Sequence, residues 1–373
     1  MKVLFFANTD WYLYNFRLEL AEYIKNKGWD VIFVSPRGDY SEKLSKEGWK
    51  YIPLEFSRKG VNPFREYQTI RQIKKIYIKE KPDLVHHFTI KCVIYGSLAA
   101  KSVNIKGIIN SITGLGYIFL GTSIFAKLIK SIVKKLYQKA LTGTEVIFEN
   151  PDDAELFQKL SLVESTQAHI VLGTGINTNK FIPIPPPDSV PLITLPARML
   201  WDKGISEFVE AASILKKKNI KARFALVGKN DEGNPRSISF DQLTLWQKEG
   251  NVEWWGWQDD IIPVFSMSDV ICLPSYREGL PKVLIEAAAC GRPIVTTDVP
   301  GCREVVQDGV NGYLVPVKNA EKLADALEKL ILDRELRNSM GIESRKIAVK
   351  LFSSDNVNLN IFSIYQKAVS KWN

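Results

Sequence analysis

Two glutamates separated by seven residues, Glu278 and Glu286, flank a glycine-containing turn that opens a helix. The hydrophobic strand 270–274 runs into this turn, and the alanine-rich helix stops at Gly291 and Pro293. The first turn of a helix presents free backbone N–H groups and a positive dipole end, which favour a phosphate group. Carboxylates accept hydrogen bonds from sugar hydroxyls. Because both kinds of group stand together, we expect a nucleotide sugar to bind here.

The segments around this unit alternate between strands and helices in two blocks. Apolar runs bounded by turn residues predict strands at 2–7, 30–35, 84–88, 108–112, 145–149, 192–196, 224–227, 252–255, 270–273, 294–297 and 312–315. Helical periodicity predicts helices at 16–27, 62–79, 93–102, 123–139, 204–217, 237–248, 261–265, 283–290 and 320–332. This alternation indicates an α/β fold with two doubly wound, Rossmann-like parallel sheets. Since ligands of such sheets bind beyond the carboxyl ends of the strands, we expect the site in a cleft between two facing domains.

A proline-rich connector separates the two blocks. Four prolines lie within 177–188, and their fixed backbone favours an extended linker. We therefore expect an N-terminal domain at 1–182 and a C-terminal domain at 183–352. The last segment, 353–373, is expected to form a helix that packs back on the N-terminal domain.

Size and composition are those of a two-domain soluble protein. The chain has 373 residues, 45% of them hydrophobic and 24% charged. Its four cysteines (Cys92, Cys272, Cys290 and Cys302) lack the paired spacing of a metal site, and no Asp-x-Asp sequence occurs. We expect reduced thiols, no bound metal and no cofactor. The N-terminus reads as a buried strand, and no apolar run approaches the roughly 20 residues of a membrane span, so we expect a cytoplasmic protein.

Positive charge is concentrated in one part of the chain. The net charge is +9, and residues 56–139 hold sixteen basic against three acidic residues. Such a field attracts a polyanion, which could be an anionic lipid surface, a lipid-linked diphosphate or a nucleic acid. Within it, 123–141 has apolar residues at helical spacing and lysines on the remaining faces, among them Lys127, Lys130, Lys134 and Lys135. Such a helix can lie on an anionic membrane or pack its stripe on the core, and we expect peripheral attachment to the inner face of the cell membrane.

Several motifs, taken together, resemble the retaining glycosyltransferases of family 4, which have the GT-B fold. Beside the two glutamates, they are Cys-Gly-Arg-Pro-Ile-Val at 290–295, Asp-Gly-Val-Asn-Gly-Tyr-Leu-Val at 308–315 and Ala-Arg-Met-Leu-Trp-Asp-Lys-Gly at 197–204. In the N-terminal half, the segments 14–17, 89–100 and 113–116 resemble a subgroup of bacterial enzymes that add N-acetylgalactosamine or a related hexose to a lipid-diphosphate-linked sugar. The resemblance covers nearly the whole chain.

The resemblance implies roles for residues on the donor side, in the C-terminal domain. Arg198 and Lys203 match the pair that holds the donor diphosphate, and two phosphates require cations. Glu278 matches the carboxylate that positions the donor sugar and stabilises developing positive charge. Glu286 matches the carboxylate that binds the ribose. Trp257 stands where the family contacts the nucleotide base, although a packing role is equally open.

Backbone groups complete the expected donor site. Gly279 and Leu280 supply N–H groups beside Glu278, and a glycine lets a ligand approach closely. Lys282 and Val283 begin the helix, where amides can meet a phosphate.

The chain departs from the family on the acceptor side, in the N-terminal domain. Asn-Thr-Asp-Trp at 8–11 replaces a Gly-Gly pair of many members, which makes Asp10 a candidate base for the acceptor hydroxyl; the alternative is a helix cap or turn residue. Thr113 stands where many members have a histidine that contacts the donor sugar. We group Thr113 with Arg17 and Lys91 as candidate acceptor-binding residues. Arg17 and Lys91 could hold the acceptor diphosphate, and the alternative is that they are only surface charges.

These observations together predict a metal-independent, retaining glycosyltransferase. It would move a hexose or N-acetylhexosamine from a UDP-sugar to a polyprenyl-diphosphate-linked glycan during the assembly of cell-surface polysaccharide. A UDP-sugar epimerase or a phosphorylase of the same fold is an alternative, although no lysine is marked for the pyridoxal phosphate of a phosphorylase. A non-enzymatic binder of anionic membranes or nucleic acid is another, but no recognisable nucleic-acid module occurs. His86 and His87 lie on a buried strand, where packing is expected although one could border the cleft.

Overall fold

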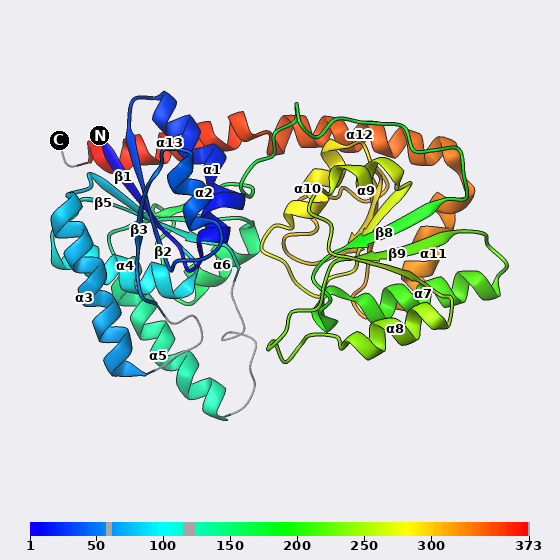
Figure 1. The fold of residues 1–373 in the computed structure, drawn as a ribbon, viewed down its shortest axis with the longest axis horizontal. Coiled ribbons are helices and arrows are strands. Elements are labelled where there is room, and N and C mark those ends of the chain that lie inside the picture. Colours follow the sequence, from blue (N-terminus) through cyan, green and yellow to red (C-terminus); the bar gives the residue numbers. More distant parts are fainter. Residues whose placement is uncertain (57–61, 115–123, 372–373) are drawn as a thin grey trace. The chain divides into compact units, whose positions relative to one another are not determined.

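The computed structural model describes residues 1–56, 62–114 and 124–371, with side chains throughout these ranges except at Pro63 and 124–130. The chain forms two compact units, Met1–Thr174 together with Ser354–Asn373, and Gly175–Ser353 (Figure 1). Each unit is a parallel sheet with helices on its faces. No helix in the described ranges is long and apolar enough to cross a lipid bilayer.

The first unit is built on a seven-stranded parallel sheet with the order β3-β2-β1-β4-β5-β6-β7. Its strands are β1 (Lys2–Phe6), β2 (Asp30–Ser35), β3 (Lys50–Pro53), β4 (Leu84–Phe88), β5 (Gly107–Ile112), β6 (Glu145–Phe148) and β7 (Ala168–Ile170). Side chains of β1 alternate between two cores, with Val3 and Phe5 in one and Leu4 and Phe6 in the other. All four are fully buried, as expected of a parallel strand with helices on both sides.

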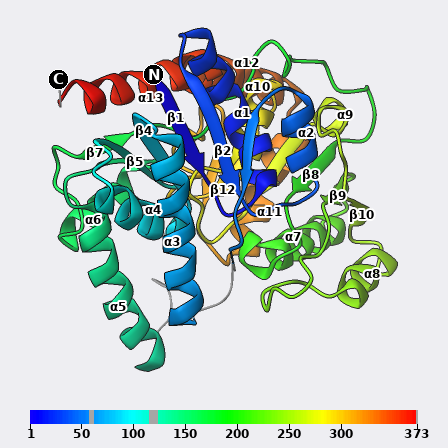
Figure 2. The ribbon, with the colours of Figure 1, turned by 60° about the vertical axis from the view of Figure 1, so that its left-hand side comes forward.

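Seven helices of the described ranges cover this sheet. They are α1 (Asp10–Asn26), α2 (Ser41–Lys46), α3 (Pro63–Glu80), α4 (Ile90–Ser102), α5 (Ile124–Leu141), α6 (Pro151–Lys159) and α13 (Ser354–Ser370). Residues of α1 and α13 share a core on one face, and residues of α3 and α4 share a core on the other. Figure 2 shows α3, α4 and α5 gathered on the same side, and α4 contacts both of its neighbours.

The C-terminal helix α13 belongs to the first unit although it follows the second in sequence. Phe362 contacts the rings of Tyr23 and Trp29, and the Tyr365 hydroxyl hydrogen-bonds Nδ1 of His86 on β4. Burial of this apolar face ties the end of the chain to its beginning.

The second unit is built on a six-stranded parallel sheet with the order β10-β9-β8-β11-β12-β13. Its strands are β8 (Leu192–Pro196), β9 (Arg223–Val227), β10 (Glu253–Gly256), β11 (Val270–Leu273), β12 (Ile294–Thr297) and β13 (Gly312–Val315). Its helices are α7 (Ile205–Lys217), α8 (Phe240–Lys248), α9 (Ile262–Met267), α10 (Lys282–Ala289), α11 (Ala320–Leu332) and α12 (Arg334–Phe352), with a short 3-10 turn, η2, at Trp201–Lys203. Two doubly wound parallel sheets confirm the predicted fold class.

The proline-rich connector is fastened to the second unit by two arginines. The guanidinium of Arg345 donates hydrogen bonds to the carbonyls of Phe181 (2.6 Å) and Thr178 (2.9 Å). The buried guanidinium of Arg292 donates to the carbonyl of Ile184. The chain therefore crosses between the units at 174–175 and 353–354, where the sequence analysis expected 182–183 and 352–353.

Candidate active site

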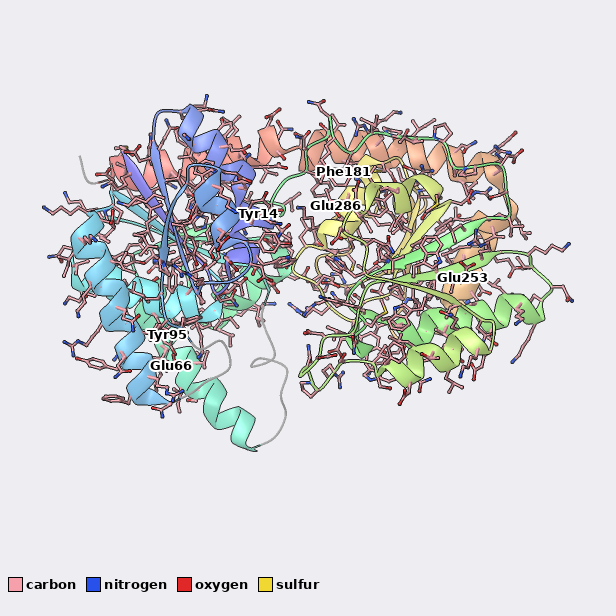
Figure 3. The ribbon with its side chains drawn as sticks, in the orientation of Figure 1. Tyr14, Glu66, Tyr95, Phe181, Glu253 and Glu286 are labelled. Carbon is pink, nitrogen blue, oxygen red and sulfur yellow. The ribbon has the colours of Figure 1, made fainter. Side chains whose placement is uncertain are left out.

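The residues expected on the donor side lie at one edge of the six-stranded sheet. Arg198 and Lys203 follow β8, Trp257 follows β10 and Glu278 follows β11, while Glu286 lies on α10 (Figure 3). All strand pairs of this sheet are parallel, so the carboxyl ends of these strands meet at the same edge. Ligands of doubly wound sheets bind at this edge.

Lys203 and Glu278 are bound to each other. The Lys203 ammonium donates to Oε1 of Glu278, and the Ser275 hydroxyl donates to the same oxygen at 2.5 Å. The side chains of Lys203 and Glu278 are 19% and 12% exposed, so the pair is partly shielded from water. A lysine 75 residues away in sequence therefore orients the glutamate after β11.

The Lys-Gly sequence at 203–204 has a steric reason. Gly204 follows the η2 turn with a φ of 71°, a left-handed conformation that favours glycine. A Cβ atom there would lie 2.1 Å from the carbonyl oxygen of Pro274, at the end of β11. The absence of a side chain thus lets the turn that carries Lys203 approach the strand that leads to Glu278.

Arg198 is held by a loop that follows β9. Its Nη1 donates to Oδ2 of Asp231 at 2.8 Å, and the Asn234 amide donates to the same oxygen at 3.0 Å. The Arg198 side chain is 60% exposed, which leaves much of its guanidinium accessible. Asp231 therefore fixes the direction of an otherwise solvated cation.

The same loop, residues 229–238, is paired with the segment of Arg198 and Lys203 along its length. The N–H of Met199 donates to the carbonyl of Lys229 and the N–H of Trp201 to that of Arg236, both at 3.0 Å. The Arg236 guanidinium also binds the carboxylate of Asp202. Sequence analysis did not identify Asp231 and Arg236, because their partners lie more than thirty residues away and only the β8–β9 pairing brings them together.

The beginning of α10 has no side-chain cap. Pro281 is its N-cap residue and has no side chain that could cap the helix, and no acidic residue lies in the first turn. Glu286, one turn further on, lies 3.9 Å from the ammonium of Lys282. Gly279 and Leu280 lie in the preceding turn and Val283 in the first turn of the helix, so all the predicted backbone contributors are adjacent.

Trp257 presents an exposed ring at the same sheet edge. It is 52% exposed, and its indole N–H donates to Oδ1 of Asp259 at 2.9 Å. The ammonium of Lys229 lies 5.6 Å from the ring centroid. An oriented, solvent-facing indole can stack on a planar base, whereas a core packing residue would be buried.

Asp10 is buried and is bound by three backbone N–H groups. It is only 5% exposed, and its carboxylate accepts the backbone N–H groups of Trp11, Tyr40 and Ser41 at 2.8 to 2.9 Å. A Cβ atom on Gly38 would lie 2.5 Å from one of its oxygens, so the loop closes tightly over it. These three N–H donors occupy much of the hydrogen-bonding capacity of the carboxylate, so a role as base for the acceptor hydroxyl stays a prediction.

Arg17 is enclosed rather than presented to a ligand. It is 2% exposed, its guanidinium carbon lies 4.3 Å from the Phe88 ring centroid, and it donates to the Tyr12 hydroxyl. Its Nη2 lies 3.7 Å from the carboxylate of Glu149, whose pKa burial raises to about 7. The expected contact of Arg17 with an acceptor diphosphate therefore has no support, because the side chain is sealed in a cation–aromatic and ionic cluster.

Lys91 and Thr113 stay near the surface at the carboxyl edge of the seven-stranded sheet. The ammonium of Lys91, at the start of α4, donates to Oε1 of Glu66 on α3 at 2.7 Å and is 22% exposed. Figure 3 shows Glu66 and Tyr95 close together between these helices. Lys91 is therefore a held but reachable cation.

A small cavity lies beside Thr113. Its volume is about 230 Å³, and it is lined by Thr89, Ile90, Ser111, Ile112, Thr113, Gly114 and Tyr137. The Thr89 hydroxyl is buried and has no hydrogen-bond partner in the described part of the chain. Thr89 also has a φ of 72°, which is strained for a β-branched residue. Sequence analysis named Thr89 only as part of a motif.

His86 and His87 are packing residues, as expected. Both are fully buried. His86 contacts the hydroxyls of Ser111 and Tyr365, and His87 contacts Tyr77 and Asn110. Burial lowers the pKa of His87 to about 4 and that of His86 well below its usual value, so both are neutral at pH 7.

Across residues 1–56, 62–114 and 124–371, no three His, Cys, Asp or Glu side chains gather as metal ligands would. The four cysteines are buried free thiols, as expected for reduced cysteines. Metal independence and the absence of a cofactor remain predictions.

Comparison with known proteins identifies relatives along most of the chain. Residues 177–347 match the family model "Glycosyl transferases group 1", and residues 2–150 match "Glycosyl transferase 4-like". The chain is 31% identical to the N,N'-diacetylbacillosaminyl-diphospho-undecaprenol alpha-1,3-N-acetylgalactosaminyltransferase of Campylobacter jejuni, over 94% of each protein. It is 23% identical to the UDP-Gal:alpha-D-GlcNAc-diphosphoundecaprenol alpha-1,3-galactosyltransferase of Escherichia coli, over 90% of this chain and 88% of that protein.

Solved structures share the same fold. A glycosyltransferase from Rickettsia africae superposes with a TM-score of 0.81 at 21% sequence identity, over 100% of this chain and 99% of that one. At 21% sequence identity this similarity supports a shared fold and nothing more specific. With the two family models and the relative from Campylobacter jejuni, it shows that the chain belongs to the group 1, family-4-like glycosyltransferases, which have the GT-B fold.

Proposed function

We propose that this glycosyltransferase moves a hexose or N-acetylhexosamine from a UDP-sugar to a polyprenyl-diphosphate-linked glycan, with retention at the anomeric carbon and without a metal ion. The observation that carries the proposal is the Lys203–Glu278 ion pair, with Arg198 and the first turn of α10 at the same sheet edge. The names of the two undecaprenol-diphosphate transferases that resemble the chain support the acceptor class, and one of them names UDP as the carrier of its donor.

The donor diphosphate would bind to Arg198, Lys203 and the first amides of α10. A guanidinium binds phosphate oxygens bidentately, and an ammonium has three N–H donors, so Lys203 can keep Glu278 and still reach a phosphate. These positive groups would stabilise the charge that develops on the departing UDP. Trp257 would stack on the uracil, and Glu286 would accept hydrogen bonds from the ribose hydroxyls.

The transfer step would take place on one face of the sugar. The bond from the anomeric carbon to the UDP oxygen breaks, the bond to the acceptor oxygen forms on the same face, and the acceptor proton passes to a departing phosphate oxygen. Between these two events the sugar carries positive charge, and the negative charge of Glu278 would stabilise it. This step needs no additional base.

The acceptor would bind to the first unit. Lys91 and the cavity beside Thr89 and Thr113 lie at the carboxyl edge of its sheet, where a phosphate group would find a cation and a helix N-terminus. We also propose peripheral attachment to the inner face of the cytoplasmic membrane, because a polyprenyl acceptor is embedded in a bilayer. The product would then serve the assembly of a cell-surface polysaccharide.

The test is a screen of UDP- and GDP-sugars with short-chain polyprenyl-diphosphate-linked sugar acceptors, with products read by mass and their anomeric configuration by NMR. We expect transfer from one UDP-sugar that persists in excess EDTA, and at least a hundredfold lower rate with Glu278→Gln. The matched control is Glu253→Gln, which changes a carboxylate at the opposite end of β10 in the same sheet and should leave the rate unchanged. Failure of every donor with every acceptor, or full activity of Glu278→Gln, would contradict the proposal.

A further inference from the structure

The outward face of α3 combines large apolar side chains with cations. All the described exposed residues of this helix except Arg65 recur at helical spacing and form one stripe, which consists of Phe64, Tyr67, Gln68, Arg71, Lys75, Ile78 and Lys79. Phe64, Tyr67 and Ile78 are 68%, 59% and 55% exposed. We call this stripe the α3 face. It holds three large apolar residues and three cations, and no acidic residue.

The folding of the first unit does not account for the α3 face. The helix already has a separate core-facing side, on which Ile73 and Tyr77 are at most 2% exposed. Its two acidic residues also turn away from the stripe. Glu66 binds the ammonium of Lys91 at 2.7 Å, and the buried Glu80 binds Lys50. The positive charge of the α3 face is therefore not neutralised by its own helix.

A second helix extends this surface. Both views show α5 beside α3, with the first residues of the two helices at the same end of the unit (Figures 1 and 2). In the described half of α5, Ile132 is 52% exposed, and Lys135 and Lys139 are exposed as well. The combination of apolar side chains and lysines is thus common to two neighbouring helices. The side chains of Lys127 and Lys130 lie outside the described residues.

We propose that the α3 face, continued by Ile132 and Lys135 of α5, is the surface by which the protein docks on an anionic lipid bilayer. This inference rests on the proposed function, in which the acceptor is held in a membrane. Aromatic side chains favour the interface between headgroups and acyl chains, and nearby lysines and arginines are attracted to anionic lipids. A nucleic acid would satisfy the cations but would leave Ile78 and Ile132 exposed to water, so a bilayer fits the whole set better.

The experiment is co-sedimentation of the full chain with vesicles of phosphatidylcholine alone or with 30% phosphatidylglycerol. We expect binding to the anionic vesicles that weakens at high salt. Replacing the three apolar residues together, as Phe64→Ser, Tyr67→Ser and Ile78→Ser, should lower the partition coefficient at least tenfold. Arg71→Ser with Lys75→Ser should lower it and reduce its salt dependence.

Matched control variants change the same chemistry elsewhere. Leu332→Ser, Ile342→Ser and Leu359→Ser remove three apolar side chains that are 68%, 58% and 55% exposed on other helices. Lys217→Ser with Lys221→Ser removes two exposed cations of the second unit. Both controls should bind vesicles like the unmodified chain. Equal binding by the α3 variants, or equal loss by the controls, would overturn the proposal.

Activity separates this inference from the proposed function. With a water-soluble, short-chain acceptor, the α3 variants should transfer sugar at the unmodified rate, because the α3 face contains none of the residues proposed to bind the donor or the acceptor. Loss of transfer to this acceptor would assign the face to catalysis and overturn the docking role. If the unmodified chain transferred nothing yet bound anionic vesicles through α3, the proposed function would fail while the docking surface stood. Release of the protein from vesicles by a short RNA that binds the α3 face more tightly would also overturn the choice of a bilayer.

Discussion

At the scale of single residues, the donor side of the site is held together by ion pairs before any ligand arrives. Lys203 is bound to Glu278, and Arg198 is bound to Asp231. In the proposed function a diphosphate enters among these charges, so the affinity for the donor would depend on how each cation is oriented as well as on its presence. Preorganised charges of this kind stabilise a transition state without reorganising at the moment of reaction.

Asp231→Ala should weaken the binding of the donor more than the binding of the acceptor. Without the bond at 2.8 Å, the exposed Arg198 side chain loses its fixed direction and more of its entropy must be given up on binding. We expect the KM for the UDP-sugar to rise about fivefold, which corresponds to ~1 kcal/mol, with the acceptor KM unchanged. Glu253→Ala breaks a comparable exposed pair with Arg223 at the other end of β9 and β10 and should change neither KM. A lower donor KM in Asp231→Ala would show instead that Asp231 competes with the diphosphate.

Gly204→Ala should destabilise the second unit by more than its backbone conformation alone explains. Gly143 has nearly the same φ (70° against 71°), but a Cβ atom there would meet nothing within 4 Å, whereas the one on Gly204 would lie 2.1 Å from the Pro274 oxygen. We expect Gly143→Ala to lower the free energy of unfolding by about 1 kcal/mol and Gly204→Ala to lower it by at least twice as much, as measured by urea unfolding. Equal costs would refute the steric argument for the Lys-Gly sequence.

Glu149 makes the stability of the first unit depend on pH. Burial raises the pKa of Glu149 from 4.5 to about 7 in the folded chain, so its protonated form is favoured by folding. The contribution of Glu149 to stability is complete below pH 4.5 and is lost as the pH rises to about 7. The free energy of unfolding of Glu149→Gln, relative to that of the unmodified chain, should therefore rise by up to about 3 kcal/mol between pH 4.5 and pH 8. Urea unfolding at both pH values checks this, and Glu155→Gln, at an exposed position, should show no such gain.

At the scale of elements, α13 packs on the first unit although it follows the second unit in the sequence. Its inner face shares a core with α1 although some 340 residues separate them. Phe362→Ala should cost about 3 kcal/mol, because it removes a ring packed against Tyr23 and Trp29. Leu359→Ala, on the exposed side of the same helix, should cost less than about 0.5 kcal/mol. Similar losses from the two changes would show that α13 is not anchored as described.

The buried strands could be predicted well because their apolar runs are continuous. β2, β4, β8, β11, β12 and β13 begin and end at the predicted residues. β3 was not predicted, since it is a four-residue edge strand with an exposed lysine and a proline at its ends. α12 was missed for another reason. Its buried face includes Gly341, Ser344 and Ala348, so its sequence lacks a strong apolar period. Gly341 is needed there because a Cβ atom would lie 2.3 Å from the carbonyl oxygen of Gly291.

The candidate site was predictable where a local motif carries it and not where distant segments meet. Arg198, Lys203, Glu278 and α10 stand in short motifs, and the structure brings them to one sheet edge. Asp231 becomes a partner of Arg198 only through the pairing of β8 with β9. The burial of Arg17 could not be predicted, because its partners Tyr12, Phe88 and Glu149 lie far apart in sequence and only the fold brings them around it.

At the scale of the whole molecule, the chain divides its chemistry between two units with the same kind of architecture. The second unit carries the cations and carboxylates that we propose to bind the donor, and the first carries Lys91 and the α3 face. The two units are joined twice, at 174–175 and at 353–354, and Arg345 and Arg292 fasten the proline-rich segment to the second unit between those points. The proline content indicated a connector, but the hydrogen bonds to its carbonyls decide to which unit it belongs.

The most direct test of this account is the affinity of UDP for the full chain, measured by calorimetry without acceptor or metal. We predict micromolar binding that weakens at least tenfold in both Arg198→Ala and Lys203→Ala, and that stays unchanged in Glu253→Ala. A chain that does not bind UDP, or that binds it equally well in all four forms, would contradict the claim that these two cations hold the donor.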